Sequence, residues 1–502
     1  MENALNTKAF GKNDIRGIFP SEVNSKLFFN VAKGYVSWAQ EQFNKINERK
    51  YPSQMLFAVC MDARLHSKEL KDAIVQGITS VGANVLDLGL APTPIGYFSE
   101  FAKIEKDILK DKKVDGALII TASHNPSEYN GLKMTFNRSS LSEEQIKEVK
   151  QHTIKAWEQS QGFSYRTVKS GEVIEYDMIS NYIEKISNNF DKIGEGIKIV
   201  VDSANATGGI VAPKLYRDLG CEVVELFSEP DGNFPNHHPN PSDEKTLEAI
   251  KKEVVAQSAD FGIAFDGDSD RIGVVSSSGQ TISGDKLLLI YALDLINELK
   301  SRGEKPSIVS EVKCSQVLYD TINEQGGCAI MHKTGHGYIK SKMKETGALL
   351  AGEMSGHVFF KDRYYGFDDA VYAGCRLIEI VAKNKKINPK FDLSELIEPF
   401  NKVHLSQEVR LTCPNDFKKA VLEELEGKIC DELFNSKIKE IVTIDGLRII
   451  FEDGFALIRQ SNTEPVFTLR FEASDKEKCE HYQKTLCDLA QSLVEQHTNA
   501  KV

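Results

Sequence analysis

Three segments of the chain repeat one pattern, and this repeat constrains the fold more than any other feature. The segments span residues 56–89, 198–227 and 307–335. In each, an apolar β-branched run precedes a polar loop, an amphipathic helical pattern, a glycine and a second apolar run. Strand–helix–strand units of this length are β-α-β crossovers with parallel strands. Because the repeats lie more than about 100 residues apart, they indicate three similar α/β domains and not a solenoid, whose period is shorter.

Local signals mark where several of these helices begin and end. The three repeated helices are expected to end near Gly82, Gly220 and Gly327, because glycine suits the left-handed position that follows a helix. A further helix is predicted over about residues 140–159, where Ser140 and Glu143 fit a capping box. That helix is expected to close the first domain.

The last hundred residues have a different pattern. Residues 445–473 predict a strand, a tight turn at Asp453-Gly454, a second strand, a loop and a third strand. A long helical pattern follows from about residue 475 to 495. The predicted fold class is therefore α/β, with three similar mixed α/β domains and a C-terminal α+β domain. The expected domain ranges are 1–170, 171–280, 281–400 and 401–502.

Composition narrows the class of protein. The chain has 502 residues and a formal net charge of −11, which argues against nucleic-acid binding and against adsorption to an anionic membrane. Residues 1–20 lack the apolar core of a signal peptide, and no long apolar run predicts a transmembrane helix. The nine cysteines show no C-x-x-C spacing. They indicate reduced thiols in a cytoplasmic protein, not a disulfide framework or a zinc site.

The segment GALIITASHNPSEYNGLKMT, residues 116–135, contains a candidate nucleophile. An apolar strand delivers Ser123 onto a loop that Asn125 and Pro126 force to turn. A serine hydroxyl needs a base or cationic surroundings to react at neutral pH, and His124 and Lys133 supply candidates for both. Taken alone, however, such a loop is more often an ordinary turn.

A second segment, DFGIAFDGDSDRIGVV, places three carboxylates after an apolar strand. In an extended chain, Asp266, Asp268 and Asp270 would share one face and repel one another unless a cation neutralises them. Oxygen ligands favour Mg²⁺ over zinc. An EF-hand loop is rejected because Arg271 stands where that loop requires glycine. A solvated acidic turn is the remaining structural alternative.

Two loops carry groups suited to a sugar phosphate. In AGEMSGHVFF, Glu353, Ser355 and His357 alternate, and a carboxylate with a hydroxyl can bind vicinal sugar hydroxyls. In IRQSNTEP, residues 458–465, a guanidinium, two hydroxyls, an amide and clustered backbone N–H groups suit a phosphate that is not transferred. Each loop alone is about as consistent with an ordinary polar connection.

Together and in this order, the four motifs resemble those of the α-D-phosphohexomutase superfamily across nearly the whole chain. The GEMSGH loop is most similar to the phosphomannomutase/phosphoglucomutase branch. The resemblance implies four domains around a central active-site cleft, each contributing one loop. It also implies a phosphoserine at Ser123, with His124, Lys133, Arg16 and Arg271 as its catalytic neighbours. An oxygen of Ser123 and the three aspartates, Asp266, Asp268 and Asp270, would hold Mg²⁺.

The same resemblance assigns the substrate-binding residues. They are Lys313, His336, Glu353, Met354, Ser355, Gly356, His357, Arg459, Ser461, Asn462 and Thr463. The implied reaction passes a phosphoryl group between the 1- and 6-positions of mannose or glucose phosphates, through a hexose 1,6-bisphosphate. Hexose phosphates are then the only expected partners of a cytoplasmic monomer or homodimer. One departure stands out, since the family often has tyrosine where this chain has Asn13.

Three alternatives stay open. The nearest is the same chemistry on glucosamine phosphate. A second is a phosphatase of the haloacid-dehalogenase type with Asp266 as nucleophile, although that motif prefers threonine or valine where Asp270 stands. A third is a non-catalytic sugar-phosphate sensor, although such a protein is expected to have lost Ser123 or one of the aspartates. The acceptor of the proton also stays open among Lys133, His124 and Arg16.

Overall fold

The computed structural model describes residues 5–46, 50–104, 112–161, 169–461 and 464–499. Two compact units make up the chain, and each consists of two segments. The first unit is Met1–Ile282 with Gly356–Asp392, and the second is Ser283–Ser355 with Leu393–Val502. Both units are described below by their own sheets and helices.

The first sheet of the first unit is mixed, with strand order β1-β5-β4-β2-β3-β7 and β6 beside β5. β2 runs parallel to β3 and β4, whereas β5 is antiparallel to β4 and β1. The first predicted β-α-β repeat is therefore confirmed. The strands are β1 Ile15–Ile18, β2 Leu56–Met61, β3 Asn84–Leu90, β4 Gly116–Ile120, β5 Tyr129–Phe136, β6 Ser139–Ser140 and β7 Val173–Glu175.

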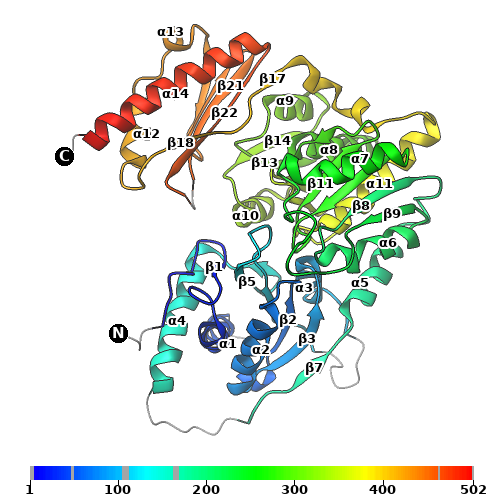
Figure 1. The fold of residues 1–502 in the computed structure, drawn as a ribbon, viewed down its shortest axis with the longest axis vertical. Coiled ribbons are helices and arrows are strands. Elements are labelled where there is room, and N and C mark those ends of the chain that lie inside the picture. Colours follow the sequence, from blue (N-terminus) through cyan, green and yellow to red (C-terminus); the bar gives the residue numbers. More distant parts are fainter. Residues whose placement is uncertain (1–4, 47–49, 105–111, 162–168, 462–463, 500–502) are drawn as a thin grey trace. The chain divides into compact units, whose positions relative to one another are not determined.

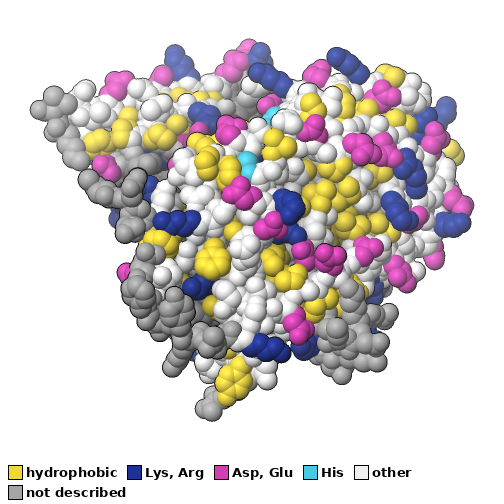
Figure 2. All heavy atoms as spheres, turned by 60° about the horizontal axis from the view of Figure 1, so that its bottom comes forward, with side chains coloured by type: hydrophobic (Ala, Val, Ile, Leu, Met, Phe, Trp, Pro, Cys, Tyr) yellow, Lys and Arg dark blue, Asp and Glu magenta, His cyan; other side chains and the backbone are white. Residues whose placement is uncertain are grey.

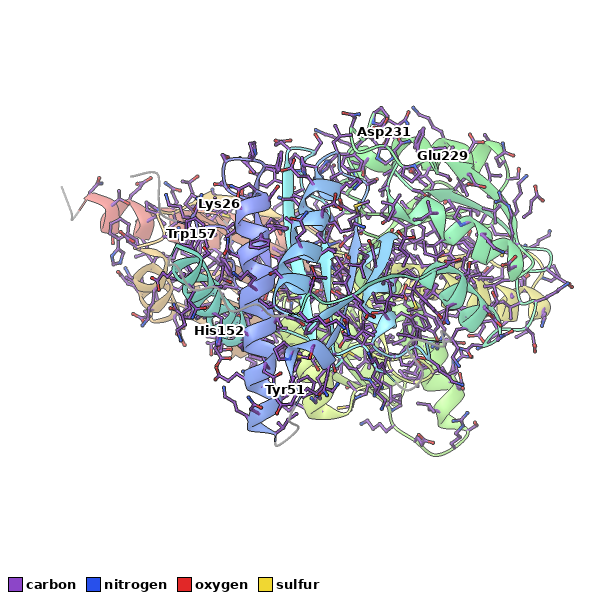
Figure 3. The ribbon with its side chains drawn as sticks, turned by 90° about the horizontal axis from the view of Figure 1, so that it is seen from below. Lys26, Tyr51, His152, Trp157, Glu229 and Asp231 are labelled. Carbon is purple, nitrogen blue, oxygen red and sulfur yellow. The ribbon has the colours of Figure 1, made fainter. Side chains whose placement is uncertain are left out.

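Helix α1 packs between α2 and α4 beside this sheet (Figure 1). Figure 3 shows Lys26 on α1 near Trp157 on α4, and the ammonium lies 4.1 Å from the ring centre. The helix predicted over about residues 140–159 is confirmed as α4, but its capping box is formed by Ser142 and Gln145. Ser140 belongs instead to the short strand β6. The helices are α1 Ser25–Lys45, η1 Pro52–Gln54, α2 Ser67–Ser80, α3 Thr93–Ser99 and α4 Glu143–Gln161.

The second sheet of the first unit has strand order β12-β11-β10-β8-β9. β8 is parallel to both β9 and β10, so the second predicted repeat is also confirmed. The elements are α5 Met178–Ser187, β8 Lys198–Asp202, η3 Thr207–Ile210, α6 Ala212–Asp218, β9 Glu222–Leu226, η4 Glu244–Leu247, α7 Glu248–Ala256, β10 Phe261–Phe265, β11 Ile272–Ser276 and β12 Thr281–Ile282. The second segment of this unit adds β16 Val358–Phe360 and α11 Ala370–Ile387.

In the second unit, β13 lies between β14 and β15 and is parallel to both. This confirms the third predicted repeat. Gly82 and Gly220 adopt positive φ after their helices as expected, but in this repeat the left-handed residue is Gly326, one position before Gly327. The elements are α8 Gly284–Lys300, β13 Ser307–Glu311, α9 Gln316–Glu324, β14 Cys328–His332, α10 His336–Thr346, β15 Leu350–Gly352 and η5 Leu393–Lys402.

The C-terminal sheet is antiparallel, with order β17-β22-β21-β20-β19 and β18 beside β22. Helix α14 lies across it (Figure 1), and Tyr482 of that helix stacks on Phe451 within a buried apolar cluster. The elements are β17 His404–Leu405, β18 Val409–Thr412, α12 Lys418–Glu426, α13 Asp431–Phe434, β19 Ile438–Val442, β20 Leu447–Phe451, β21 Gly454–Gln460, β22 Val466–Ala473 and α14 Lys476–Asn499.

The described residues thus form mixed α/β layers followed by an α+β domain, which confirms the predicted fold class. All nine cysteines are free thiols, and of these Cys430 is exposed. Figure 2 shows acidic and basic side chains interspersed over the face that it draws. None of the helices in the described part of the chain combines the length and the apolar content that a membrane crossing requires.

Candidate active site

The candidate nucleophile lies at the end of a central strand of the first sheet. β4 is buried along its whole length and leads into a loop whose first polar residues are Thr121 and Ser123. Ser123 is buried, adopts a left-handed φ of 51°, and donates its N–H to Thr121 Oγ1 at 2.8 Å. Its Oγ donates a hydrogen bond to Asp266 Oδ2 at 2.7 Å. The serine and the first aspartate are therefore in direct contact.

The three aspartates lie on a tight turn after β10. An extended chain was expected here, and that expectation is wrong, because Ser269 has a φ of 60° and donates its N–H to the carbonyl of Asp266 at 3.2 Å. The turn still brings the carboxylates together, since ligand oxygens of Asp266, Asp268 and Asp270 all lie within 4.8 Å of one another. All three residues are buried.

Lys133 neutralises part of this charge. From β5, its ammonium contacts Asp268 Oδ2 at 2.6 Å and also Asp270. Burial lowers the pKa of Lys133, but the two carboxylates outweigh that effect and raise it well above its usual value. Burial, together with the charges of Asp270 and Asp268, raises the pKa of Asp266 well above its usual value. The cluster therefore carries more negative charge than its lysine balances.

The donor set fits a divalent cation. Among the described residues, Asp268 Oδ1 is a buried oxygen with no hydrogen-bond partner. Three carboxylates within reach of one another are hard oxygen ligands of the kind that Mg²⁺ prefers. These residues can hold such an ion.

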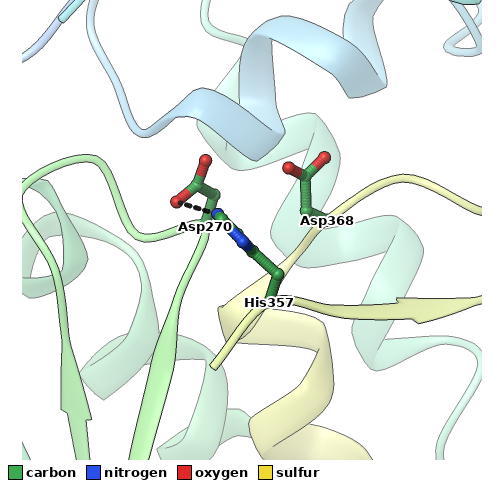
Figure 4. Close-up of side chains that lie close together, drawn as sticks. All are labelled: Asp270, His357 and Asp368. Atoms are coloured by element: carbon green, nitrogen blue, oxygen red, sulfur yellow. Dashed lines mark ion pairs between the residues drawn. The ribbon is translucent and has the colours of Figure 1, made fainter. Parts of the chain in front are cut away.

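His357 and Asp368 extend the cluster from the second segment of the first unit. Figure 4 shows His357 beside Asp270, with Nε2 3.3 Å from Asp270 Oδ1, and Asp368 close to both. Arg271 Nε also lies 3.3 Å from His357 Nε2. Burial raises the pKa of Asp270, but Lys133 and His357 outweigh it and hold that pKa well below its usual value. His357 thus belongs to the carboxylate cluster, whereas the sequence suggested a role in sugar binding.

The remaining predicted neighbours also lie around the serine loop. His124 Nδ1 is 3.2 Å from Ser123 Oγ. The charge of Arg271, burial and the charge of Arg16 lower the pKa of His124 far below its usual value. Arg16 donates to Asn125 Oδ1 at 2.7 Å and pairs with Asp14. All five predicted catalytic residues are therefore in the first unit: on the serine loop, beside the aspartates or, for Arg16 on β1, in contact with the serine loop.

The second unit contains the first part of the predicted sugar-binding loop, up to Ser355. Glu353 is buried and its Oε1 accepts the N–H of Gly335 at 2.7 Å, next to His336, the first residue of α10. The N–H of Met354 donates to Glu311 Oε1 at 2.8 Å. Lys313 lies 3.6 Å from the same oxygen. Glu311 therefore ties together two of the predicted substrate-binding positions.

The predicted phosphate-binding loop follows β21. Arg459 is buried, and its Nε donates to Asp445 Oδ2 at 3.0 Å. The same oxygen accepts the N–H of Thr334 at 3.1 Å. After Arg459 in the same loop, the carbonyls of Ser461 and Glu464 accept hydrogen bonds from Lys418 at 3.0 Å and 2.6 Å. The other two predicted residues of this loop, Asn462 and Thr463, lie outside the described residues.

Sequence reasoning missed three residues of these sites. Thr93 donates its hydroxyl to Asp268 Oδ2 and its N–H to the carbonyl of Asp268. The other two are Asp368 and Asp445. Each is a common type of residue, and none belongs to a run of chemically unusual residues; Thr93 is the first residue of α3. For Asp445, the Asp-Gly dipeptide before β20 was a sequence signal for a turn, and Gly446 does adopt a φ of 85°. Two predicted substrate-binding residues remain to be placed: Gly356 has a positive φ, and Ser355 is half-buried.

Comparison with known proteins agrees with this architecture. Four phosphoglucomutase/phosphomannomutase family models match in order, with alpha/beta/alpha domains I, II and III at residues 7–160, 180–279 and 283–403 and the C-terminal domain at 408–489. A phosphomannomutase/phosphoglucomutase of Pseudomonas aeruginosa is 36% identical over 95% of this chain and 94% of its own length. A phosphoglucomutase of Neisseria gonorrhoeae is 39% identical, covering 94% of each chain.

A crystal structure supports the same assignment. That of a phosphoglucomutase/phosphomannomutase family protein from Burkholderia thailandensis has a TM-score of 0.84 at 35% identity, covering 97% of each chain. The fold and the site define an α/β protein with successive related domains and a buried serine–carboxylate centre. The chain belongs to the phosphoglucomutase/phosphomannomutase family.

Proposed function

We propose that this chain reversibly transfers a phosphoryl group between the 1- and 6-positions of mannose phosphates and of glucose phosphates. The observation that carries the proposal is the hydrogen bond from Ser123 Oγ to Asp266 Oδ2, inside a buried cluster of carboxylates and cations. A serine hydroxyl in that position can carry a phosphoryl group, because neighbouring cations offset its charge. Family membership and the names of the relatives support the hexose substrates.

The proposed cycle begins with phosphate on Ser123. A free hydroxyl of the hexose monophosphate attacks the phosphorus, the bond to Ser123 Oγ breaks, and a hexose 1,6-bisphosphate forms. After the sugar has turned end over end, Ser123 Oγ attacks the other phosphate and the isomeric monophosphate leaves. Such transfers depend mainly on position and on charge neutralisation. When bound by Asp266, Asp268, Asp270 and an oxygen of phosphoserine, Mg²⁺ supplies positive charge beside the phosphoryl group.

The side chains of the first unit have distinct proposed tasks. Lys133 and Arg271 hold positive charge beside the aspartates, and Arg16 holds it beside Asn125. The attacking hydroxyl loses a proton, and the candidates to accept it are Lys133, His124 and Arg16. Of these, His124 has a ring nitrogen within hydrogen-bonding reach of Ser123 Oγ. Separate pH–rate profiles of variants at the three positions distinguish them.

The second unit supplies the proposed recognition groups. Glu353 and Ser355 would bind sugar hydroxyls, with support from Lys313 and His336. Arg459, Ser461, Asn462 and Thr463 would hold the phosphate that is not being transferred, since a guanidinium with clustered hydroxyl and N–H donors is suited to that anion. His357 has its contacts in the carboxylate cluster, so we assign it to the phosphoryl-transfer centre.

The test combines intact mass with turnover. Wild-type protein incubated with a hexose 1,6-bisphosphate should gain one phosphate that a phosphatase removes, and it should convert mannose 1-phosphate to mannose 6-phosphate. Ser123→Ala should lose both properties, while Ser127→Ala, an exposed serine on the same loop, should keep both. Near-normal turnover by Ser123→Ala refutes the carrier role. Parallel assays with glucose and glucosamine phosphates decide the sugar class.

A further inference from the structure

Both terminal nitrogens of the Arg64 guanidinium donate hydrogen bonds to the loop that carries Ser123. This arginine follows β2, and its side chain is fully buried. One terminal nitrogen donates to the carbonyls of Ser123 at 2.9 Å and Asn125 at 2.6 Å. The other donates to the carbonyls of Pro126 and Tyr129, the latter at 3.1 Å. Four backbone oxygens of one loop therefore converge on one side chain.

The fifth donor of Arg64 anchors it to the sheet. Its Nε donates to Asp62 Oδ2 at 3.0 Å, and Asp62 in turn donates its N–H to the carbonyl of Ile120 on β4 at 2.9 Å. A guanidinium has five N–H donors in a fixed plane, and here each has an acceptor. A buried charge is tolerated only when it is paired and hydrogen-bonded, and this one meets both conditions.

The loop requires such support because its backbone is strained. Ser123 adopts a φ of 51°, a left-handed conformation that is unfavourable for a residue other than glycine. Its carbonyl points inward, where a buried oxygen needs a donor, and Arg64 supplies that donor. The same segment holds the far end of the loop, because Ser67 and His66 both contact the side chain of Asn130.

The loop that follows β9 packs on the other side of this arginine. The Arg64 guanidinium lies 5.4 Å from the ring centre of Phe234. Figure 3 labels Glu229 and Asp231 in the same loop, and the backbone of Ala63, Arg64 and Leu65 approaches Gly232 closely. Arg64 is therefore fixed from several elements and cannot easily change its rotamer.

We propose that Arg64 is a positioning residue for phosphoryl transfer: it holds the Ser123 backbone so that Oγ stays aligned with Asp266. This inference rests on the proposed function, because it assigns Arg64 a role in that reaction. The hydrogen bonds of the Arg64 guanidinium go to Asp62 and to the carbonyls of the serine loop, so we assign its positioning effect to that loop. Lysine keeps the charge but has a single nitrogen, so it cannot satisfy four carbonyls in one plane.

The test is Arg64→Lys in the full-length protein. Because a misplacement of about 1 Å can slow transfer about 10²-fold, we expect kcat to fall by about that factor. The KM for mannose 1-phosphate should stay within about threefold, since uniform substrate binding is unchanged. Phosphorylation of Ser123 by a hexose 1,6-bisphosphate, followed by intact mass, should slow in parallel with kcat.

Arg376→Lys is the matched control. Arg376 is also a buried arginine of the first unit, but it pairs with Asp362 on the α11 side. We expect this variant to lose thermal stability without losing kcat. The proposal is overturned if Arg64→Lys keeps kcat within about threefold of wild type, or if Arg376→Lys loses as much.

A second variant keeps the proposal testable if Arg64→Lys does not fold. Asp62→Asn leaves the guanidinium in place but weakens its anchor, and we expect kcat to fall about tenfold at unchanged KM. An unchanged kcat in this variant contradicts the proposal. Failure of the proposed function would look different, because wild-type protein itself would then neither carry phosphate on Ser123 nor turn over mannose 1-phosphate.

Discussion

The carbonyl oxygen of Ser123 lies 2.4 Å from the point where a β-carbon on Gly267 would stand. Real β-carbons do not approach a backbone oxygen so closely, and Gly267 separates the first two aspartates of the cluster. The serine loop and the aspartate turn therefore fit together only because residue 267 has no side chain.

Gly267→Ala should accordingly separate Ser123 from Asp266. We expect kcat to fall about 10²-fold, because the reacting groups lose their alignment. Steady-state turnover of mannose 1-phosphate measures this. Gly427→Ala is the control, since the atom nearest to a β-carbon added at that position would lie at an ordinary 3.6 Å. Equal activity of the two variants would show that the close approach has no functional role.

Asp268→Asn should raise the Mg²⁺ concentration needed for half-maximal turnover by at least about tenfold. A carboxamide oxygen is neutral and is a weaker ligand for a hard cation than a carboxylate. Titration of MgCl₂ into chelator-treated enzyme measures the requirement. Asp72→Asn, an exposed aspartate on α2, should behave as wild type. An unchanged Mg²⁺ requirement in Asp268→Asn would count against the proposed ion site.

Lys133→Met should destabilise the first unit by about 3–5 kcal/mol in chelator, because it leaves buried carboxylates without their counter-ion. Added Mg²⁺ should then raise the Tm of the variant more than it raises that of the wild type, since the ion binds the folded state. Thermal unfolding with and without MgCl₂ provides the comparison. If the two proteins respond equally, Lys133 and the ion do not balance the same charges.

Asp445→Asn should weaken substrate binding more than it slows transfer. Asp445 holds Arg459, which we propose to bind the non-transferred phosphate, so its loss should raise KM about tenfold with kcat nearly unchanged. Steady-state kinetics with mannose 1-phosphate tests this, with the exposed Glu440→Gln as control. A fall in kcat at constant KM would instead place Asp445 in the chemical step.

Glu472 should make stability depend on pH. Burial raises its pKa to about 7, against the smaller opposing effects of Ser315 and Arg448. The folded state therefore binds more protons than the unfolded state between the ordinary glutamate value of 4.5 and about 7, so Glu472 contributes less stability as pH rises through that window. Between about pH 5 and pH 8, the Tm of Glu472→Gln should therefore fall less than the Tm of the wild type. An identical pH dependence in both proteins would contradict this.

Much of the fold could be predicted because local and tertiary preferences agree. Apolar β-branched runs and glycines marked the three repeated units, and the turn at Asp453-Gly454 marked the hairpin. The helix start near residue 142 was misplaced because two serines in one short segment can each begin a capping box, and only strand pairing decides between them. Ser139 and Ser140 pair with β5, so the cap moves to Ser142.

The site was predicted where its chemistry lies in short motifs, as in the contact between Ser123 and the aspartates. It was missed where chemistry depends on distant pairing. Arg64 lies 59 residues before Ser123 in sequence, and nothing in its neighbours marks it as a donor to that loop. Thr93 and Asp445 are similar, because a single polar residue gains its role only when the fold supplies its partner.

Asp445 joins two loops that are far apart in sequence, since one of its oxygens binds both Arg459 and the backbone of Thr334. Glu353 binds the neighbouring Gly335. The residues proposed to bind the sugar hydroxyls and those proposed to bind the non-transferred phosphate are thus linked by hydrogen bonds to the adjacent backbone groups of Thr334 and Gly335. A hexose that binds in either orientation meets the same fixed spacing between these two groups of residues. A preference for one isomer therefore has to originate elsewhere in the protein.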